Sequence, residues 1–369
     1  DILARPERVT DIIKTELADL NQRFGDKRRT ELLVGEVLSL EDEDLIEEEE
    51  IVITLTNNGY IKRLANNEFR AQRRGGRGVQ GMGVHNDDFV KNLVSCSTHD
   101  TLLFFTNNGK VYRAKGYEIP EYGRTAKGIP IINLLGIDSS EKIQAIIAVT
   151  GQAEEGHYLF FTTRQGTVKR TTVTAFANIR SNGLIAIGLK EDDELVNVLL
   201  TDGRSNIIIG THNGYSVTFS EEAVRDMGRT ASGVRGIRLR EEDYVVGAAL
   251  MNEDQEVLII TEKGYGKRTK VSEYPVKGRG GKGIKTANIT EKNGPLAGLA
   301  TVVGDEDIML ITDKGVIIRF NVATVSQTGR ATLGVRLIKM EADTKVVTMA
   351  TVEPESPEEP TSEEVDAST

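Results

Sequence analysis

A phrase of about a dozen residues returns six times along this 369-residue chain. Each copy has an apolar run, a polar turn that ends in glycine, and a second short run, as in IVITLTNNGYIKR from Ile51. Glycine can adopt the positive φ of a tight turn, so each phrase predicts a β-hairpin. The turn glycines are Gly59, Gly109, Gly166, Gly214, Gly264 and Gly315, and a second series follows at Gly78, Gly128, Gly183, Gly233, Gly283 and Gly334. Two series with one period of about 50 residues indicate six structural repeats.

The repeats predict an all-β fold. A further apolar run precedes several hairpins, as at 244–251 and 296–303, which gives three to four strands per repeat. Six such units are typical of a bladed, propeller-like disc. The run VVTMATV at 346–352 has no hairpin after it, and the first repeat lacks such a run before its hairpin. We therefore expect 346–352 to pair into the first blade and close the ring.

The segments outside the repeats differ in composition. Helical spacing of Val9, Ile12, Ile13, Leu17, Leu20 and Phe24 predicts an amphipathic helix that begins near Pro6. We expect a helical segment at 1–33, an acidic linker at 34–50, the six-bladed domain at 51–352 and a disordered acidic tail at 353–369. Cys96 is the only cysteine, which excludes an intrachain disulfide and favours a cytoplasmic setting; we expect it to be buried.

Charge is distributed unevenly along the chain. The formal net charge of −10 taken alone argues against a nucleic-acid partner. However, residues 41–50 contain 8 acidic and no basic side chains, and residues 353–369 contain 7 acidic and no basic side chains. Residues 51–352 contain 39 basic and 33 acidic side chains. The repeats are thus mildly basic and lie between two acidic segments.

The most distinctive stretch consists of Gln72, Arg73, Arg74, Gly75, Gly76, Arg77 and Gly78. Glycines let backbone N–H groups approach a phosphate, and guanidinium groups match phosphate oxygens with forked donors. We interpret this stretch as a phosphate-binding loop; the alternative is a flexible basic loop without a partner. Related loops of later repeats contain Arg124, Lys127, Arg229, Lys277, Arg279, Lys282 and Arg330, and hairpin ends add Lys62, Arg63, Arg113, Lys169, Arg170, Lys267, Arg268 and Arg319.

Equivalent positions of successive blades are expected to lie along one rim, so these residues predict a basic belt. Such a belt suits duplex DNA that is bound through its phosphates without reading of the bases. The fourth repeat has Val217 and Thr218 where other repeats have Lys and Arg, so we expect the belt to weaken there. A propeller that serves as a protein-interaction scaffold, with solubilising basic loops, is the alternative from another class.

Motifs for catalysis and cofactor binding are missing from the sequence. No GxxxxGK[ST] or GxSxG motif occurs, and the four histidines lie far apart without metal-ligand spacing. No apolar run approaches the roughly 20 residues of a membrane span. We therefore expect no cofactor, no metal and no membrane partner for this chain.

The motif QRRGGRG, preceded by ITLTNNGYIKR, closely resembles the seven-residue box of the C-terminal domain of the A subunit of bacterial DNA gyrase. The phrase YPVKGRGGKGIKT from Tyr274 resembles the fifth blade of that family, and ELADLNQRFGDKRRTELL from Glu16 looks like the end of its coiled-coil arm. The resemblance spans nearly the whole chain except the acidic tail. The A-type subunit of topoisomerase IV is the alternative within the family, but its box is usually missing or degraded.

The resemblance implies a six-bladed β-pinwheel, in which neighbouring blades exchange strands, with 1–33 as the helical end of the coiled-coil arm. It also implies that the domain, monomeric when isolated, wraps DNA around its rim in a positive, right-handed sense. The full enzyme would include the B subunit together with a second copy of the A-type chain, and would use ATP and Mg²⁺ to introduce negative supercoils. Arg77 stands where lysine is common in the box.

The family's catalytic tyrosine follows an arginine, and none of the nine tyrosines here does so. The resemblance therefore places the DNA-breakage chemistry outside this chain.

Overall fold

The computed structural model describes residues 2, 4–25, 45–65, 79–80, 88, 90–123, 125–149, 156–341 and 343–352. The chain divides into two compact units, residues 1–45 and residues 46–369. In the first unit, helix α1 (Pro6–Phe24) has proline in its first turn, as the sequence predicts, and the chain leaves the helix at Gly25. Its apolar side chains are exposed, from 37% for Val9 to 77% for Phe24.

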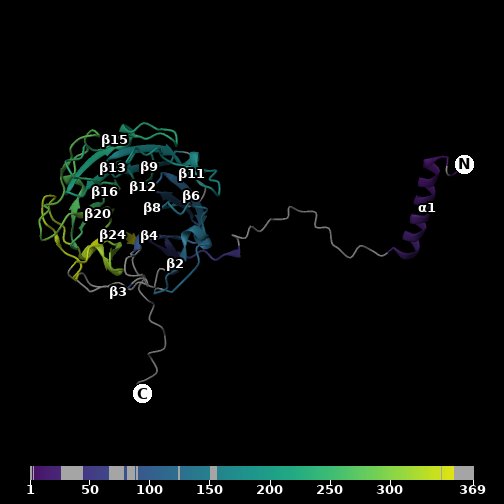
Figure 1. Ribbon diagram of the computed structural model, residues 1–369, viewed down its shortest axis with the longest axis horizontal. Helices are drawn as coiled ribbons and strands as arrows, with labels where there is room; N and C mark the ends of the chain where they lie inside the picture. The colour runs from purple at the N-terminus through teal and green to yellow at the C-terminus, as the bar shows by residue number, and fades with distance from the viewer. Residues whose placement is uncertain are drawn as a thin grey trace, which may run out of the picture. The chain divides into compact units, whose positions relative to one another are not determined.

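The second unit contains six four-stranded antiparallel sheets, the blades, arranged in a ring (Figure 1). Each blade is built around a hairpin: β1 (Glu50–Thr56) and β2 (Tyr60–Ala65), β5 (Thr101–Thr106) and β6 (Lys110–Lys115), β9 (Tyr158–Thr163) and β10 (Thr167–Thr172), β13 (Asn206–Thr211) and β14 (Tyr215–Ser220), β17 (Glu256–Thr261) and β18 (Tyr265–Lys270), β21 (Asp307–Thr312) and β22 (Val316–Asn321).

An inner strand flanks each hairpin on the side of the ring's centre: β4 (Val90–Ser97), β8 (Ile143–Val149), β12 (Leu195–Thr201), β16 (Val245–Met251), β20 (Leu296–Val302) and β24 (Val346–Val352). A two-residue crossing strand flanks it on the other side: β3 (Val79–Gln80), β7 (Ile129–Pro130), β11 (Leu184–Ile185), β15 (Val234–Arg235), β19 (Ile284–Lys285) and β23 (Val335–Arg336). Short 3₁₀ turns are η3 (Gly116–Glu118), η4 (Ile131–Asn133), η5 (Val173–Phe176), η6 (Glu221–Ala223), η7 (Val271–Glu273) and η8 (Val322–Thr324).

Each crossing strand comes from the repeat that follows the blade it joins. Strand β7 pairs with β2 of the first blade although it follows the second hairpin, and β15 pairs with β10 of the third blade although it follows the fourth hairpin. The inner strand, in contrast, follows its own hairpin, so β16 pairs with β13 and not with the next hairpin. This exchange confirms the six-bladed β-pinwheel that the resemblance implies.

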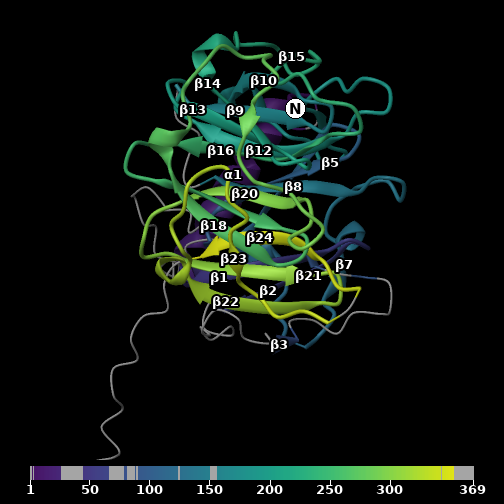
Figure 2. The same ribbon diagram turned by 90° about the vertical axis from the view of Figure 1, so that its left-hand side faces the viewer.

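The ring is closed in a different way from the one predicted. The segment 346–352 forms β24, which pairs with β21 in its own sixth blade, so the expected pairing with the first blade is wrong. The first repeat does not lack an inner strand, because β4 follows its hairpin and pairs with β1. Closure instead comes from β3, whose Val79 pairs with Ile317 of β22. Figure 2 shows β21, β22 and β24 beside β1 and β2.

The apolar core lies between the blades. The first strand of each hairpin is buried on both faces, which explains why β1 is buried continuously from Ile51 to Thr56 rather than at alternate residues. One cluster joins Ile53 of the first blade to Phe104 of the second, and another joins Val52 of the first blade to Met309 of the sixth. Cys96 lies in the first of these clusters as predicted, and burial raises the pKa of its thiol to about 12.

Candidate nucleic-acid interface

The second glycine series lies immediately before the crossing strands. Gly128, Gly183, Gly233, Gly283 and Gly334 all have positive φ, between 71° and 96°. A Cβ atom on Gly283 would lie 2.5 Å from the carbonyl oxygen of Ser216, and one on Gly233 would lie 2.4 Å from that of Val168. Glycine is therefore needed where each loop turns against the blade it joins. We call the segment between a 3₁₀ turn and its crossing strand a crossing loop.

Three of the hairpin-end lysines are buried and bind crossing loops. The side chains of Lys62, Lys169 and Lys267 are fully buried. Lys62 Nζ donates to the carbonyl oxygens of Gly123 and Ala126 at 3.1 and 2.9 Å. Burial therefore excludes these lysines from the exposed belt predicted from the sequence.

The other two lysines make the same kind of contact. Lys169 Nζ donates to the carbonyl oxygens of Ala186, at 2.6 Å, and of Arg229. Lys267 Nζ donates to the carbonyl oxygens of Gly329, at 2.8 Å, and of Arg330. Burial lowers the pKa of both Lys169 and Lys267 to about 8.

The arginines at the hairpin ends are also largely engaged inside the fold. Arg319 is buried and donates to Asp307 Oδ2 at 2.8 Å. Arg268 donates to Glu256 Oε2 at 2.7 Å, and Arg63 lies 3.6 Å from Glu121 Oε2. These contacts pair Arg63, Arg268 and Arg319 with carboxylates, so we do not count them among the exposed cations of the belt.

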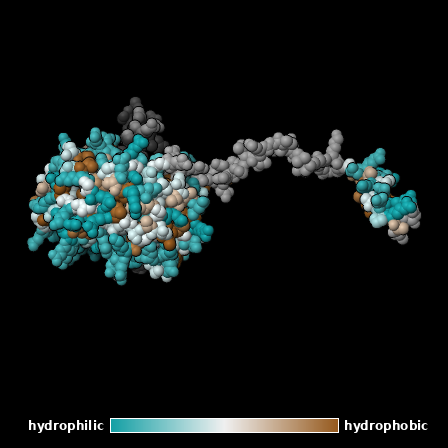
Figure 3. All heavy atoms as spheres, turned by 90° about the horizontal axis from the view of Figure 1, so that it is seen from above, coloured by the Kyte–Doolittle hydropathy of each residue, from teal (hydrophilic) through white to brown (hydrophobic). Residues whose placement is uncertain are grey.

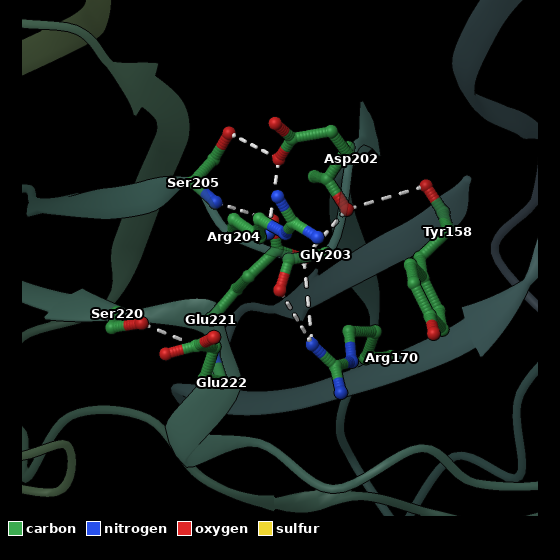
Figure 4. A network of polar contacts seen from close by, with 10 residues as sticks. Tyr158, Arg170, Asp202, Gly203, Arg204, Ser205, Ser220, Glu221 and Glu222 are labelled. Carbon is green, nitrogen blue, oxygen red and sulfur yellow. Dashed lines mark hydrogen bonds and ion pairs between the residues drawn. The ribbon is translucent and has the colours of Figure 1, made fainter. Parts of the chain in front are cut away.

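Arg170 shows how such a residue is held (Figure 4). Its Nη1 donates to the carbonyl oxygen of Gly203 at 3.2 Å and lies 3.9 Å from Glu221 Oε2, and the guanidinium lies 4.5 Å from the centre of the Tyr158 ring. Glu221 is itself buried, which raises the pKa of its carboxyl group. Arg170 therefore joins β10 to the turn after β12 and to the end of β14.

Four of the predicted residues that the structure describes are exposed, and three of them lie on one crossing loop. Lys277, Arg279 and Lys282 are exposed on the loop before β19, and Arg113 is exposed on β6. Three more residues, Lys127, Arg229 and Arg330, are half-buried, and Lys127 Nζ lies 3.8 Å from the centre of the Tyr60 ring. The box residues 72–78 and Arg124 lie outside the described residues.

Sequence reasoning missed three cations on the crossing strands themselves. The second residue of β15, β19 and β23 is Arg235, Lys285 and Arg336, and all three are exposed. Each stands two positions after a glycine of the second series. A basic residue at this distance from the glycine could therefore have indicated these three cations in the sequence.

Two arginines of the crossing loops link neighbouring loops. Arg279 Nη1 donates to the carbonyl oxygen of Arg235 at 3.0 Å, and Arg330 Nη1 donates to that of Lys285 at 2.6 Å. Both arginines stand five positions before their crossing strand, and both acceptors are the second residue of the preceding crossing strand. The loops of the fourth, fifth and sixth repeats are thus joined in series.

Cations are unevenly distributed among the blades. Val217 corresponds to residues that are buried in the other blades, whereas Thr218 corresponds to Arg113, which is exposed on β6, so the fourth blade lacks an exposed cation at that position. The crossing loop of the third repeat, 177–183, has only one cation, Arg180. This loop joins the second blade through β11 and β6, and it adds only this one cation to that blade.

The centre of the ring is lined in part by polar residues, several of which form ion pairs. The six inner strands line a cavity of about 1010 Å³. Among the polar residues of this cavity, Glu194 lies 3.1 Å from Arg164, and Glu262 lies 2.9 Å from Lys345.

Within the described ranges, no three His, Cys, Asp or Glu side chains lie close enough together to hold a metal ion. None of the helices in that part of the chain has the length and apolar character of a membrane span.

Figure 3 shows a mostly hydrophilic surface over the blades, with only scattered hydrophobic residues. Fold and surface together define a class: six-bladed β-propellers whose blades exchange a strand and whose exchanged loops carry cations. The chain matches the family described as "DNA gyrase C-terminal domain, beta-propeller" at residues 50–97, 100–150, 157–202, 205–250, 255–302 and 306–353. It belongs to this family.

Curated relatives include the A subunits of the DNA gyrases of Streptococcus pyogenes serotype M3, Streptococcus pneumoniae and Staphylococcus aureus, at 68%, 66% and 51% identity. The alignments cover 96%, 95% and 100% of this chain but only 43%, 43% and 42% of the relatives, so the chain spans about two fifths of their length.

Two solved structures are similar. A DNA gyrase A C-terminal domain is 28% identical with a TM-score of 0.76, over 82% of this chain and 99% of that one. A C-terminal domain of DNA topoisomerase IV is 29% identical with a TM-score of 0.65, over 84% and 94% of the two chains.

Proposed function

We propose that the six-bladed unit binds duplex DNA through its phosphates and wraps it across the crossing loops. The observation that carries this proposal is the recurrence of exposed cations at equivalent positions of successive blades, such as Arg235, Lys285 and Arg336. Cations repeated at one register follow a phosphate backbone without contacting base edges. Membership in the gyrase family supports the same function.

Wrapping requires contacts on several blades. Bending 20–30 base pairs of DNA by 40–90° costs on the order of 1–6 kcal/mol, and one loop cannot offset this cost. With roughly 5 to 8 phosphates neutralised, the logarithm of the affinity should fall with the logarithm of the salt concentration at a slope of about −5 to −7. A slope near zero would contradict wrapping.

In the whole protein, we propose that this domain presents a wrapped segment, in a positive, right-handed sense, to the breakage core of a cytoplasmic gyrase. The core would include the B subunit together with a second copy of the A-type chain, with ATP and Mg²⁺ supporting negative supercoiling. We propose that ATP and Mg²⁺ bind to other parts of the complex, as the resemblance to the family implies. The resulting role of this chain is DNA binding.

The box provides the direct test. We expect simultaneous replacement of Arg73, Arg74 and Arg77 by alanine to abolish wrapping, because three forked phosphate donors are lost. The measurement is the linking change of relaxed circular DNA after incubation with the protein and topoisomerase I. A control variant with Arg5, Arg8 and Arg23 replaced by alanine removes the same charge from α1 and its N-cap and should wrap normally. Retained wrapping by the box variant would refute its assignment.

Two alternatives make different predictions. A topoisomerase IV type of C-terminal domain should bind DNA with little net linking change; the sequence QRRGGRG and the 51–68% identity to gyrase A subunits favour gyrase. A protein-interaction scaffold should not retard DNA at moderate salt. An electrophoretic shift assay of the isolated six-bladed unit, together with the linking assay, separates the three functions.

A further inference from the structure

The buried lysines alternate around the ring. The position three residues after each hairpin glycine contains lysine in the first, third and fifth blades, and an uncharged residue in the others: Lys62, Tyr112, Lys169, Val217, Lys267 and Ile318. The uncharged residues are buried like the lysines, at 5% exposure or less. The fold thus fills this position with apolar or aromatic groups in half of its blades, so packing alone does not require an ammonium group there.

The same three blades each form an isolated parallel bridge with the crossing loop that they receive. Single parallel bridges join Arg63 to Glu121, Arg170 to Asp226 and Arg268 to Gln327, each between the second hairpin strand and the incoming loop. In the fifth blade, the Arg268 N–H donates to Ser326 O at 3.1 Å and the Thr328 N–H to Arg268 O at 2.9 Å. The lysine then binds the next part of the loop, before the crossing strand pairs.

The loops that these blades receive are also related in sequence. They read GRTAKG at 123–128, GRTASG at 228–233 and GRATLG at 329–334, and each contains one arginine directly after the first glycine. The loop received by the second blade reads NIRSNG at 178–183, whereas the loop received by the fourth blade reads GRGGKG at 278–283 and also has arginine directly after its first glycine. Every blade with a buried ammonium group thus receives a Gly-Arg loop, and the fourth blade receives such a loop without a lysine beneath it.

Burying a charged group is costly unless polar partners surround it. Lys267 Nζ has three such partners on one loop, Gly329 O, Arg330 O and Thr332 Oγ1, the last at 3.2 Å. Carbonyl oxygens repel phosphate, and the ammonium group turns these carbonyls toward the interior. The backbone around Arg330 is thereby fixed before any partner binds.

We propose that Lys62, Lys169 and Lys267 are positioning residues for DNA binding, each fixing a Gly-Arg crossing loop of the next repeat so that its cation is set for a phosphate. This proposal rests on the proposed function. It divides the rim into two alternating kinds of contact. The first, third and fifth blades present lysine-fixed loops, and the second and fourth present loops held without such a lysine, for example through Arg279 and the carbonyl oxygen of Ala223 at 2.9 Å.

The test uses Lys267→Ile, because the sixth blade has Ile318 at the same position. We expect the variant to fold, to bind DNA about tenfold more weakly, and to lose about one unit of salt slope as the contact of one cation is lost. Amide hydrogen exchange at 326–334 without DNA should become faster. Lys270→Ala removes one exposed charge from the same strand and should leave this exchange unchanged.

A second variant covers the case in which Lys267→Ile does not fold. Thr332→Val removes one exposed acceptor of Lys267 and should change exchange and DNA affinity in the same direction by a smaller factor. If the folded variants melt earlier but bind DNA with unchanged affinity and slope, Lys267 is only structural and the positioning role is wrong. If the wild-type domain itself binds DNA without salt dependence, the proposed function fails instead.

Discussion

The crossing loops of the third and fifth repeats share a backbone design and differ in charge. The third-repeat loop ends at Gly183 with φ 77° and pairs through β11, and the fifth-repeat loop ends at Gly283 with φ 71° and pairs through β19. The first has one cation between 177 and 183, whereas the second has three between 277 and 283. Strand exchange and charge are therefore separate properties, since exchange builds every blade, whereas the number of cations differs from loop to loop.

The largest effect on DNA binding is expected when the two lysines of the fifth-repeat loop are removed. Lys277 and Lys282 are exposed, whereas Arg279 already donates to two backbone carbonyls. Replacing both lysines by alanine should reduce the salt slope of DNA binding by about 1.8, at about 0.9 per phosphate. Arg180→Ala in the third-repeat loop should reduce it by less than about 1. Equal effects in fluorescence-anisotropy titrations would contradict the difference between the loops.

Replacing the shared glycines tests the common backbone. Gly183→Ala and Gly283→Ala should each lower the free energy of unfolding by about 1–3 kcal/mol, because both positions have positive φ. The new Cβ would also meet the Tyr112 ring at 2.7 Å or the Ser216 carbonyl oxygen at 2.5 Å. Urea unfolding measures both values. A loss confined to one variant would show that the loops differ in backbone as well as in charge.

Exchanging one side chain between the loops should move binding in opposite directions. Asn182 and Lys282 stand directly before the two loop glycines, and both are exposed. Asn182→Lys should increase the magnitude of the salt slope by about 1, and Lys282→Asn should decrease it by about 1. The double variant should restore the wild-type slope. Failure of Asn182→Lys to strengthen binding would mean that DNA does not pass the second blade.

The smallest expected effect is a change of folding stability with pH, caused by a buried lysine that binds a crossing loop. Burial lowers the pKa of Lys169 to about 8, with Arg229 lowering it further and Asp226 raising it. Between pH 8 and the ordinary lysine pKa of about 10.5, the unfolded chain binds more protons, so folding stability due to this group rises with pH. Compared with Lys169→Met, the wild type should gain stability from pH 8 to 10 in urea unfolding. If the difference in unfolding free energy between the wild type and Lys169→Met stayed the same from pH 8 to 10, the lowered pKa of Lys169 would be contradicted.

Part of this fold could be predicted from the sequence. The six hairpins follow from their apolar runs and turn glycines, and α1 follows from the spacing of its apolar residues. The pairing of β3 with β22 could not be predicted from the sequence, because a two-residue strand has no recognisable pattern. Lys267 and Lys270 lie on one strand and look alike in sequence, yet one is buried and the other exposed. The difference depends on where the next repeat crosses, which only the folded backbone defines.

The crossing strand of the first repeat, β3, determines when the domain can close during synthesis. The crossing strand of the second repeat, β7, pairs with β2, which lies one repeat earlier in the chain, so this exchange can form as soon as its loop has left the ribosome. Strand β3, in contrast, must wait for β22 in the last hairpin. Until then, one early segment lacks its partner and one blade interface stays open, a condition that favours aggregation of nascent chains. Translation of the sixth hairpin is therefore the step that completes the domain, and a ribosome stalled before Val316 would hold an unclosed ring.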